Sequence, residues 1–483
     1  MALKTSAEVL ERLRKMDRNI YYRGEKIENP CDYPVFRPSL NSLLACYDLA
    51  QDPEYEDLMT TTSNLTGEKI NRFTTLHMSR EDLIKKVKMQ RLVGQKTSAC
   101  FQRCVIMDAA NAFYSTTFDM DKKYGTNYHE RFCEFLKYVQ TEDLNVNLAV
   151  TDPKGDRSKR PQEQADPDLF LHVVERRPDG VVVVGAKAHF TGCTNGDEAF
   201  VMPTMSLRPG DEDYAIAFSM PTDAEGLTII VGRQSSDLRK LYDGDMDNGN
   251  AEFGGIESLL VFDHVFIPNE RIFLNGETEF VGPLVDMFAS YHRNSYGGCK
   301  PGVGDVFIGA CSLLADYNGL QKASHITDKL VEMTRLNETI WSCGIASSCE
   351  GYQTEAGNWM VDRLLANVCK LNVTQFPYEI THLAEDITGG ILVTGPSEAD
   401  FNNPATGDYL RKYLAGANGA SAENKMRVLR YIENMCLGGG AVGYKTESMN
   451  GAGSPAAQKL NLRRLGNFKG KQELAKKIAG VKE

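Results

Sequence analysis

Apolar and polar positions alternate with different periods along the chain. In the first part, Leu83, Ile84 and Val87 recur at the spacing of a helix that buries one face. Ser79, followed three residues later by Asp82, resembles a capping box and marks the start of this helix. We therefore predict one long helix that begins after Ser79 and runs beyond residue 104, and shorter helices over residues 7–16 and 39–51.

The pattern changes to short β-prone runs between about residues 145 and 275. Residues 169–175 and 181–188 flank a turn-rich segment that contains Pro178 and Gly180, which predicts a β-hairpin. Further strands are expected at residues 214–218, 227–231 and 259–266. Past residue 280 the helical period returns.

The order of helices, sheet and helices predicts an α+β fold with three parts. We expect an N-terminal helical domain over residues 1–142, a β-barrel-like middle domain over 143–278 and a C-terminal helical bundle over 279–483.

Composition narrows the class of protein. The chain has 483 residues, of which 42% are hydrophobic and 25% charged, as in ordinary globular proteins. Its net charge of -11 disfavours nucleic-acid binding, which needs a basic surface. We find no apolar run long enough to span a membrane, and charged residues stand where a signal peptide would be apolar, so a cytoplasmic location is expected. Twelve cysteines are too few for a disulfide framework in a chain of this length.

Four residues in two distant segments have the chemistry of metal ligands. Cys100 and Cys104 are spaced so that both thiols share one face of the predicted helix. His292 and Cys299 lie in a second segment, in which Pro301 predicts that Cys299 and Lys300 lie on a turn. Three thiols and one imidazole fit a structural zinc site and an iron–sulfur cluster equally well, and the residues alone leave this choice open.

Other candidates are weaker. The polar turn at residues 151–157 and the strand end at residues 187–192 suit ligand contacts, although such strings are usually solvated loops or satisfied structural residues. Glu257 and Glu447 flank glycine-rich backbone, but their spacing alone does not single them out. A basic run, Lys85, Lys86, Lys88 and Arg91, can supply charge for a phosphate or form a solvated helix face. Neither a dinucleotide-binding glycine motif after a strand nor a phosphate-binding P-loop is present.

Five sequence strings together resemble the 4-hydroxybutyryl-CoA dehydratase family over nearly the whole chain. They are GQKTSACFQRC at 94–104, TDPKGDR at 151–157, YHRNSYGGCK at 291–300, KASH at 322–325 and GYKTESMNGAGSP at 443–455. This family is similar in fold to acyl-CoA dehydrogenases and to flavin-dependent 4-hydroxyphenylacetate hydroxylases. The resemblance implies an acyl-CoA dehydrogenase-like fold, a homotetramer, FAD and a [4Fe-4S] cluster.

The same resemblance implies a role for individual residues. It gives the cluster ligands as Cys100, Cys104, His292 and Cys299, and the active-site residues as His292, Tyr296, Lys300, Glu257, Glu447 and Thr191. It gives the flavin contacts as Thr151, Lys154, Gly155, Asp156, Arg157, Lys187 and Thr191, joined by Thr388, Gly389 and Gly390 from a neighbouring subunit.

The implied reaction is the radical dehydration of 4-hydroxybutyryl-CoA to crotonyl-CoA, with possible vinylacetyl-CoA isomerase activity. It requires a cofactor because the β hydrogen is not acidified by the thioester carbonyl. In this interpretation His292 exchanges at the cluster and acts as base, Tyr296 and Glu447 handle the leaving hydroxyl, Lys300 and Glu257 balance charge, and Thr191 contacts the flavin. The alternatives are a flavin-dependent aromatic hydroxylase of the same fold and a non-catalytic binding protein that the cluster merely stabilises.

Overall fold

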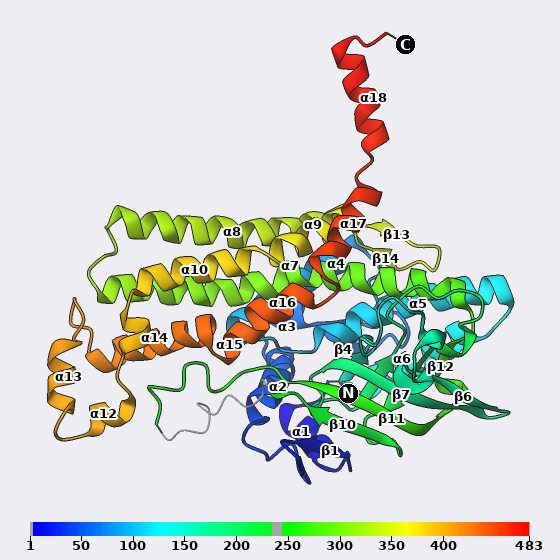
Figure 1. Cartoon of the computed structure of the whole chain (residues 1–483), viewed down its shortest axis with the longest axis horizontal. Helices are drawn as coiled ribbons and strands as arrows, with labels where there is room; N and C mark the ends of the chain where they lie inside the picture. Colours follow the sequence, from blue (N-terminus) through cyan, green and yellow to red (C-terminus); the bar gives the residue numbers. More distant parts are fainter. Residues whose placement is uncertain (1–2, 234–243, 483) are drawn as a thin grey trace.

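The computed structural model describes residues 3–233 and 244–482 (Figure 1). The N-terminal part is mainly helical. Its helices are α1 (Ser6–Arg14), α2 (Arg37–Gln51), α3 (Glu56–Met59), α4 (Arg80–Thr97), α5 (Cys104–Tyr124) and α6 (Tyr128–Glu142). Ser79 caps α4 by accepting a hydrogen bond from the backbone N–H of Asp82, so the predicted helix start is confirmed.

The prediction of one continuous helix through Cys104 is wrong. α4 ends at Thr97, where Ser98 adopts a left-handed conformation with a φ of 46°, and α5 begins only at Cys104. Gln102 has a φ of 56° in the loop between the two helices. Hydrophobic periodicity continues across this loop because both helices bury a face, so the pattern alone does not reveal the break. Cys100 therefore lies on a loop.

The middle of the chain forms two sheets. The six-stranded sheet has the order β2-β1-β10-β11-β7-β6, and the four-stranded sheet has the order β12-β9-β8-β5. The strands are β1 (Ile20–Tyr22), β2 (Glu25–Lys26), β5 (Val146–Ala149), β6 (His172–Arg177), β7 (Gly180–Thr191), β8 (Glu198–Val201), β9 (Ile216–Pro221), β10 (Leu227–Val231), β11 (Glu257–Pro268) and β12 (Ile272–Asn275). Two pairs are parallel, β1 with β10 and β5 with β8.

The predicted hairpin is confirmed, because β6 and β7 pair antiparallel with Arg177 opposite Gly180. Two small ribbons lie outside the main sheets: β3 (Thr60–Thr62) pairs with β4 (Lys69–Asn71), and β13 (Tyr352–Gln353) pairs with β14 (Trp359–Met360). The N-terminal part also lends β1 and β2 to the large sheet, which the helical pattern did not predict. The domain boundaries at residues 142 and 278 stay a prediction.

The C-terminal part is a helical bundle built on α7 (Thr278–Tyr317), which packs against α4, α5 and α8 (Ser324–Cys349) (Figure 1). The remaining helices are α9 (Arg363–Val373), α10 (Phe376–Thr388), α11 (Ile391–Thr394), α12 (Glu398–Asn402), α13 (Gly407–Tyr413), α14 (Ala422–Leu437), α15 (Gly439–Ala441), a π-helical turn at Val442–Thr446, α16 (Glu447–Asn450), α17 (Pro455–Leu465) and α18 (Phe468–Ala479). Among the described residues, none of the helices combines the length and apolarity needed to cross a bilayer.

Pro301 lies inside α7, so the predicted turn at Cys299 and Lys300 is also wrong. Close packing explains why the helix continues. A Cβ on Gly298 would lie 2.3 Å from the carbonyl oxygen of Val87, and one on Gly302 would lie 2.2 Å from that of Arg91, so these glycines let α7 press against α4. This tertiary contact outweighs the local preference of a residue that precedes proline.

Candidate active site

The loop before α5 and the middle of α7 bring together the three predicted thiol ligands. Cys104 is the first residue of α5, Cys100 lies in the preceding loop, and Cys299 lies on α7. Burial raises the pKa of the Cys104 thiol well above its ordinary value, and nearby acidic groups, including the thiols of Cys100 and Cys299, raise it further. The three sulfur atoms are therefore electrostatic neighbours, although almost two hundred residues separate their segments.

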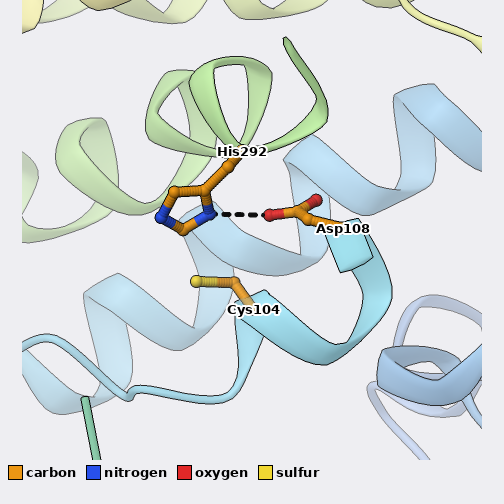
Figure 2. Close-up of side chains that lie close together, drawn as sticks. All are labelled: Cys104, Asp108 and His292. Atoms are coloured by element: carbon orange, nitrogen blue, oxygen red, sulfur yellow. Dashed lines mark hydrogen bonds and ion pairs between the residues drawn. The ribbon is translucent and has the colours of Figure 1, made fainter. Parts of the chain in front are cut away.

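His292 joins this group from α7, one helical turn before Tyr296. Its Nδ1 lies 2.8 Å from Oδ2 of Asp108 on α5. The ligand atoms of Cys104, Asp108 and His292 all lie within 4.8 Å of one another, and Figure 2 shows the Cys104 sulfur turned toward the imidazole. The sequence predicted the thiols and the imidazole but missed Asp108. A charged residue in the apolar run from Val105 to Phe113 is the signal that could have identified it.

Asp108 is itself held by a buried ion pair. Its Oδ1 lies 2.6 Å from Nζ of Lys86 on α4, and both side chains have no exposed surface. Burial raises the pKa of Asp108, but the charge of Lys86 and the hydrogen bond with His292 lower it more, so the net shift is downward. Lys86 therefore does not belong to a solvated basic face, which was one interpretation of its basic run.

Two carboxylic acids near the thiols are close enough to interact electrostatically. Glu257 starts β11, and Glu447 starts α16. Burial and the charge of Glu447 raise the pKa of Glu257 well above its ordinary value, and burial raises the pKa of Glu447. Thr191 donates a hydrogen bond of 2.8 Å to Glu257 Oε2. Both acids therefore retain their protons to higher pH than ordinary glutamates, as groups that donate protons in catalysis must.

Gln102 connects the thiol loop to this pair and was not predicted. Its side chain accepts a hydrogen bond from the Ile256 backbone N–H at 3.0 Å and donates to the Ile256 carbonyl at 3.0 Å. Its Nε2 also lies 3.4 Å from Glu257 Oε1. The sequence offers no signal for this role except the position of Gln102 between the two cysteines.

Three buried cations hold the segment that carries Glu447. Lys300 donates to the carbonyl of Gly443 at 2.6 Å, Lys370 donates to that of Ser448, and Arg293 donates to that of Ala452 at 3.0 Å. We call Lys300, Lys370 and Arg293 the cation clamp. Burial and the charges of the other two cations lower the pKa of Lys370 to about 7. The sequence singled out Lys300 alone, because Arg293 and Lys370 are ordinary until packing buries them.

Tyr296 lies between the imidazole and the cation clamp. Its ring centroid is 5.2 Å from that of His292 and 4.6 Å from Nζ of Lys370. Burial raises the pKa of the phenol well above its ordinary value. A Cβ on Gly451 would lie 2.0 Å from the phenol oxygen, so this position requires glycine. Tyr296 is thus a neutral hydroxyl that can donate a hydrogen bond.

One pocket exposes part of this arrangement. Cys100, Lys300 and Glu447 line it together with backbone from glycine-rich segments that include Gly254, Gly255 and Gly443. A thiol, an ammonium and a carboxylic acid from three distant segments therefore face the same space, where a substrate can reach them.

Except for Thr191, the predicted flavin contacts lie on other parts of the fold. Residues 151–157 form the loop after β5, in which Lys154 and Arg157 are exposed. Lys187 is buried and directs its ammonium to Asp152 Oδ1, the Val150 carbonyl and the Met202 carbonyl, so it fixes the base of this loop. Thr388 ends α10, and Gly389 and Gly390 after it have open space around them.

Both parts of the chain match models of one protein class. Residues 5–274 match the 4-hydroxyphenylacetate 3-hydroxylase N-terminal family, and residues 281–480 match the C-terminal family of the same enzyme. The fold agrees with these matches. A crystal structure of the oxygenase component of 4-hydroxyphenylacetate 3-monooxygenase complexed with FAD has a TM-score of 0.88 at 24% identity, covering 98% of each chain.

Closer similarities identify the family within this class. The chain is 60% identical to a 4-hydroxybutyryl-CoA dehydratase/vinylacetyl-CoA-Δ-isomerase of Clostridium aminobutyricum, over 99% of this chain and all of the relative. An oxygen-tolerant archaeal 4-hydroxybutyryl-CoA dehydratase from N. maritimus has a TM-score of 0.97 at 52% identity, covering 100% of this chain and 96% of the other. The chain therefore belongs to the 4-hydroxybutyryl-CoA dehydratase/vinylacetyl-CoA isomerase family, and the predicted α+β, acyl-CoA dehydrogenase-like fold is confirmed.

Proposed function

We propose that this protein is a cytoplasmic, homotetrameric hydro-lyase that converts 4-hydroxybutyryl-CoA to crotonyl-CoA and isomerises vinylacetyl-CoA. The observation that carries the proposal is that three thiols and an imidazole bonded to a carboxylate meet beside two buried glutamates with raised pKa values, in a chain 60% identical to an enzyme of that name. A hydroxylase needs no such set of sulfur ligands.

The thiol group fits a [4Fe-4S] cluster. Cys100, Cys104 and Cys299 would supply three thiolates and His292 the fourth ligand, through Nε2, because its Nδ1 faces Asp108. Protonated thiols in a buried site become thiolates when they bind a metal, since binding releases their protons. Soft sulfur ligands favour iron–sulfur clusters or zinc. The resemblance to the family, which implies a [4Fe-4S] cluster, favours the cluster over zinc.

The chain also has features that suit FAD. The exposed loop at 151–157 carries Lys154 and Arg157, which suit phosphate groups. Gly155 has a φ of 51° there, and a Cβ on it would lie 2.5 Å from the side chain of Leu169, so the loop depends on glycine. Lys187 fixes the base of the loop, and Thr388, Gly389 and Gly390 would complete the site from a second subunit. When bound, FAD supplies one-electron oxidation and the cluster supplies a Lewis acid.

The side chains would then divide the proton transfers between them. His292 would accept a substrate proton on Nε2 only while that nitrogen is not bound as a ligand, because its single lone pair cannot do both. Glu447 and Tyr296, whose pKa values burial raises, would supply a proton and a hydrogen bond to the leaving hydroxyl. Lys300 balances negative charge beside the cluster ligands. Glu257 and Thr191 would act as a hydrogen-bonded pair next to Glu447. Thr191 would also contact the flavin.

Anaerobic assay of the purified protein tests this proposal. We expect crotonyl-CoA to form from 4-hydroxybutyryl-CoA without any electron acceptor, together with about four iron and four sulfide per chain and one FAD. Cys299→Ser should lose iron and dehydratase activity, whereas Cys311→Ser, a buried cysteine elsewhere on α7, should retain both. Oxygen-dependent hydroxylation of a phenol by the iron-free protein would favour the hydroxylase instead. A full cluster with no turnover of either acyl-CoA would favour a binding protein.

A further inference from the structure

A chain of buried polar contacts runs across three helices behind His292. Lys86 on α4 contacts Asp108 on α5, and Asp108 contacts His292 on α7. Lys86 and Asp108 have no exposed surface. Burying two charges is costly even when they are paired, and hydrophobic residues of similar size often stabilise a fold better. This ion pair therefore needs an explanation other than stability.

The contacts of Asp108 define its role toward the imidazole. A carboxylate can only accept hydrogen bonds, and Asp108 accepts from Lys86 Nζ, from Ser295 Oγ at 2.8 Å and from His292 Nδ1 at 2.8 Å. Nδ1 must therefore carry a hydrogen. The lone pair of a neutral imidazole then lies on Nε2, the nitrogen on the far side of the ring from Asp108.

The ring is fixed in direction as well as in tautomer. The His292 imidazole stacks on Phe288 at 5.5 Å between ring centroids and 15° between planes, and it meets Tyr296 edge-on. Lys86 in turn is fixed by donating to the Tyr291 carbonyl at 2.8 Å. The Asp108 carboxylate, which lies among the possible metal ligands, is therefore engaged by three donors, of which Lys86 and His292 are themselves fixed by further contacts.

We propose that Asp108 and Lys86 form a positioning pair that fixes the tautomer and direction of His292, so that Nε2 faces the three thiols. This inference rests on the proposed function and extends it to two residues outside the ligand set. Asp108 keeps the ring in place whether Nε2 binds a ligand or a substrate proton. Lys86 balances the negative charge of Asp108 and holds its carboxylate in place between α4, α5 and α7.

The test uses variants that separate positioning from folding. Asp108→Asn alone leaves the Lys86 ammonium buried without a counter-charge, which can unfold the protein. The double variant Lys86→Met/Asp108→Asn removes both charges together and avoids this problem. The matched control is Arg271→Met/Glu198→Gln, which removes another largely buried ion pair, with a distance of 2.6 Å, from the β-sheet part.

The test has four readouts: the FAD content, the EPR spectrum of the reduced protein, the rate at which an anaerobic chelator removes iron, and the kinetic constants kcat and KM. The double variant should keep its FAD but lose iron about ten- to a hundredfold faster than wild type, because residues that orient a metal-bound histidine change affinity by such factors. Its EPR spectrum should change, and kcat should fall with little change in KM. The control variant should match wild type in all four measurements.

Wild-type iron release, EPR spectrum and kcat in a folded Lys86→Met/Asp108→Asn protein would overturn the positioning pair. Equal effects in the control would do the same, because they would reveal a general loss of stability. Wild-type protein without iron, sulfide or dehydratase activity would instead refute the proposed function, so the two failures are distinguishable.

Discussion

At the scale of single residues, Glu257 shows how a side chain suited to catalysis can weaken the fold. Burial, assisted by the charge of Glu447, raises its pKa well above the ordinary value of 4.5. The folded protein therefore keeps a proton that the unfolded chain has already released, so stability falls as pH rises from about 4.5 toward the raised pKa. Such a loss of folding stability is common at positions where the side chain is retained for its function.

We predict that Glu257→Gln is more stable than wild type above pH 5, with a difference that grows with pH until the carboxyl of the wild type ionises. The amide can replace the existing contacts by donating to Thr191 and accepting from Gln102. Urea unfolding at several pH values measures the difference, and dehydratase activity should fall. Glu25→Gln, at an exposed position on β2, is the control. A wild type that remains more stable than Glu257→Gln at pH 8 would contradict the raised pKa.

Single residues also show how much of the site the sequence alone could predict. The sequence could single out the candidate ligands because cysteine and histidine are chemically distinctive and lie in strings that resemble one family. Asp108, Gln102 and Lys370 were not, because an acid, an amide or an amine acquires its role only when packing buries it beside a partner. Their partners lie on other helices or, for Gln102, at the start of strand β11, at distances along the chain that no local pattern encodes.

At the scale of elements, α7 depends on glycines to approach its neighbours. A Cβ on Gly344 of α8 would lie 2.7 Å from Cα of Gly297 on α7, where only backbone could move. We predict that Gly344→Ala costs about 1–3 kcal/mol by overpacking. Gly309→Ala on α7 meets nothing within 4 Å and should gain up to about 1 kcal/mol, because alanine favours helices. Thermal unfolding compares the two variants, and equal effects would argue against the close crossing.

The cation clamp makes a prediction about the segment from Gly443 to Ala452. A hydrogen bond from a charged donor contributes about 1.5–3 kcal/mol. We expect Lys370→Met to release the Ser448 carbonyl, so that amides in this segment exchange hydrogen about ten- to a hundredfold faster. Lys329→Met, which removes a cation from the surface of α8, should leave their exchange unchanged. Unchanged exchange in Lys370→Met would mean that Lys370 does not hold this segment.

At the scale of the whole molecule, the order of helices, sheets and bundle was predictable from periodicity, but two element boundaries at the site were not. The break after Thr97 and the passage of α7 through Pro301 both follow from tertiary packing. Each error concerned backbone next to a cysteine that we propose as a ligand. Local rules fail here because the end of α4, just before the loop of Cys100, packs closely on the centre of α7, as at Gly94, whose Cβ would lie 2.8 Å from the Cys299 carbonyl.

The C-terminal helix offers a test of the proposed homotetramer. α18 stands away from the rest of the molecule (Figure 1), and none of its residues is buried. Leu474 and Ile478, which share one face, are 67% and 87% exposed. Exposed apolar faces of this kind mark protein–protein contacts. We therefore expect this face to pack on a second copy of the chain.

Truncation after Asn467 should lower the number of chains per assembly, obtained from the mass measured by light scattering. The far-UV circular dichroism of the remaining core should persist, because α18 buries no residue against its own chain. Leu474→Glu/Ile478→Glu should act in the same direction, because it places charge on the apolar face. Lys477→Glu, a charge change at an exposed position of the same helix, is the matched control and should keep the wild-type mass. If the truncated protein still forms an assembly with the wild-type number of chains, the tetramer must be held by other surfaces, and the exposed face of α18 must serve a different partner.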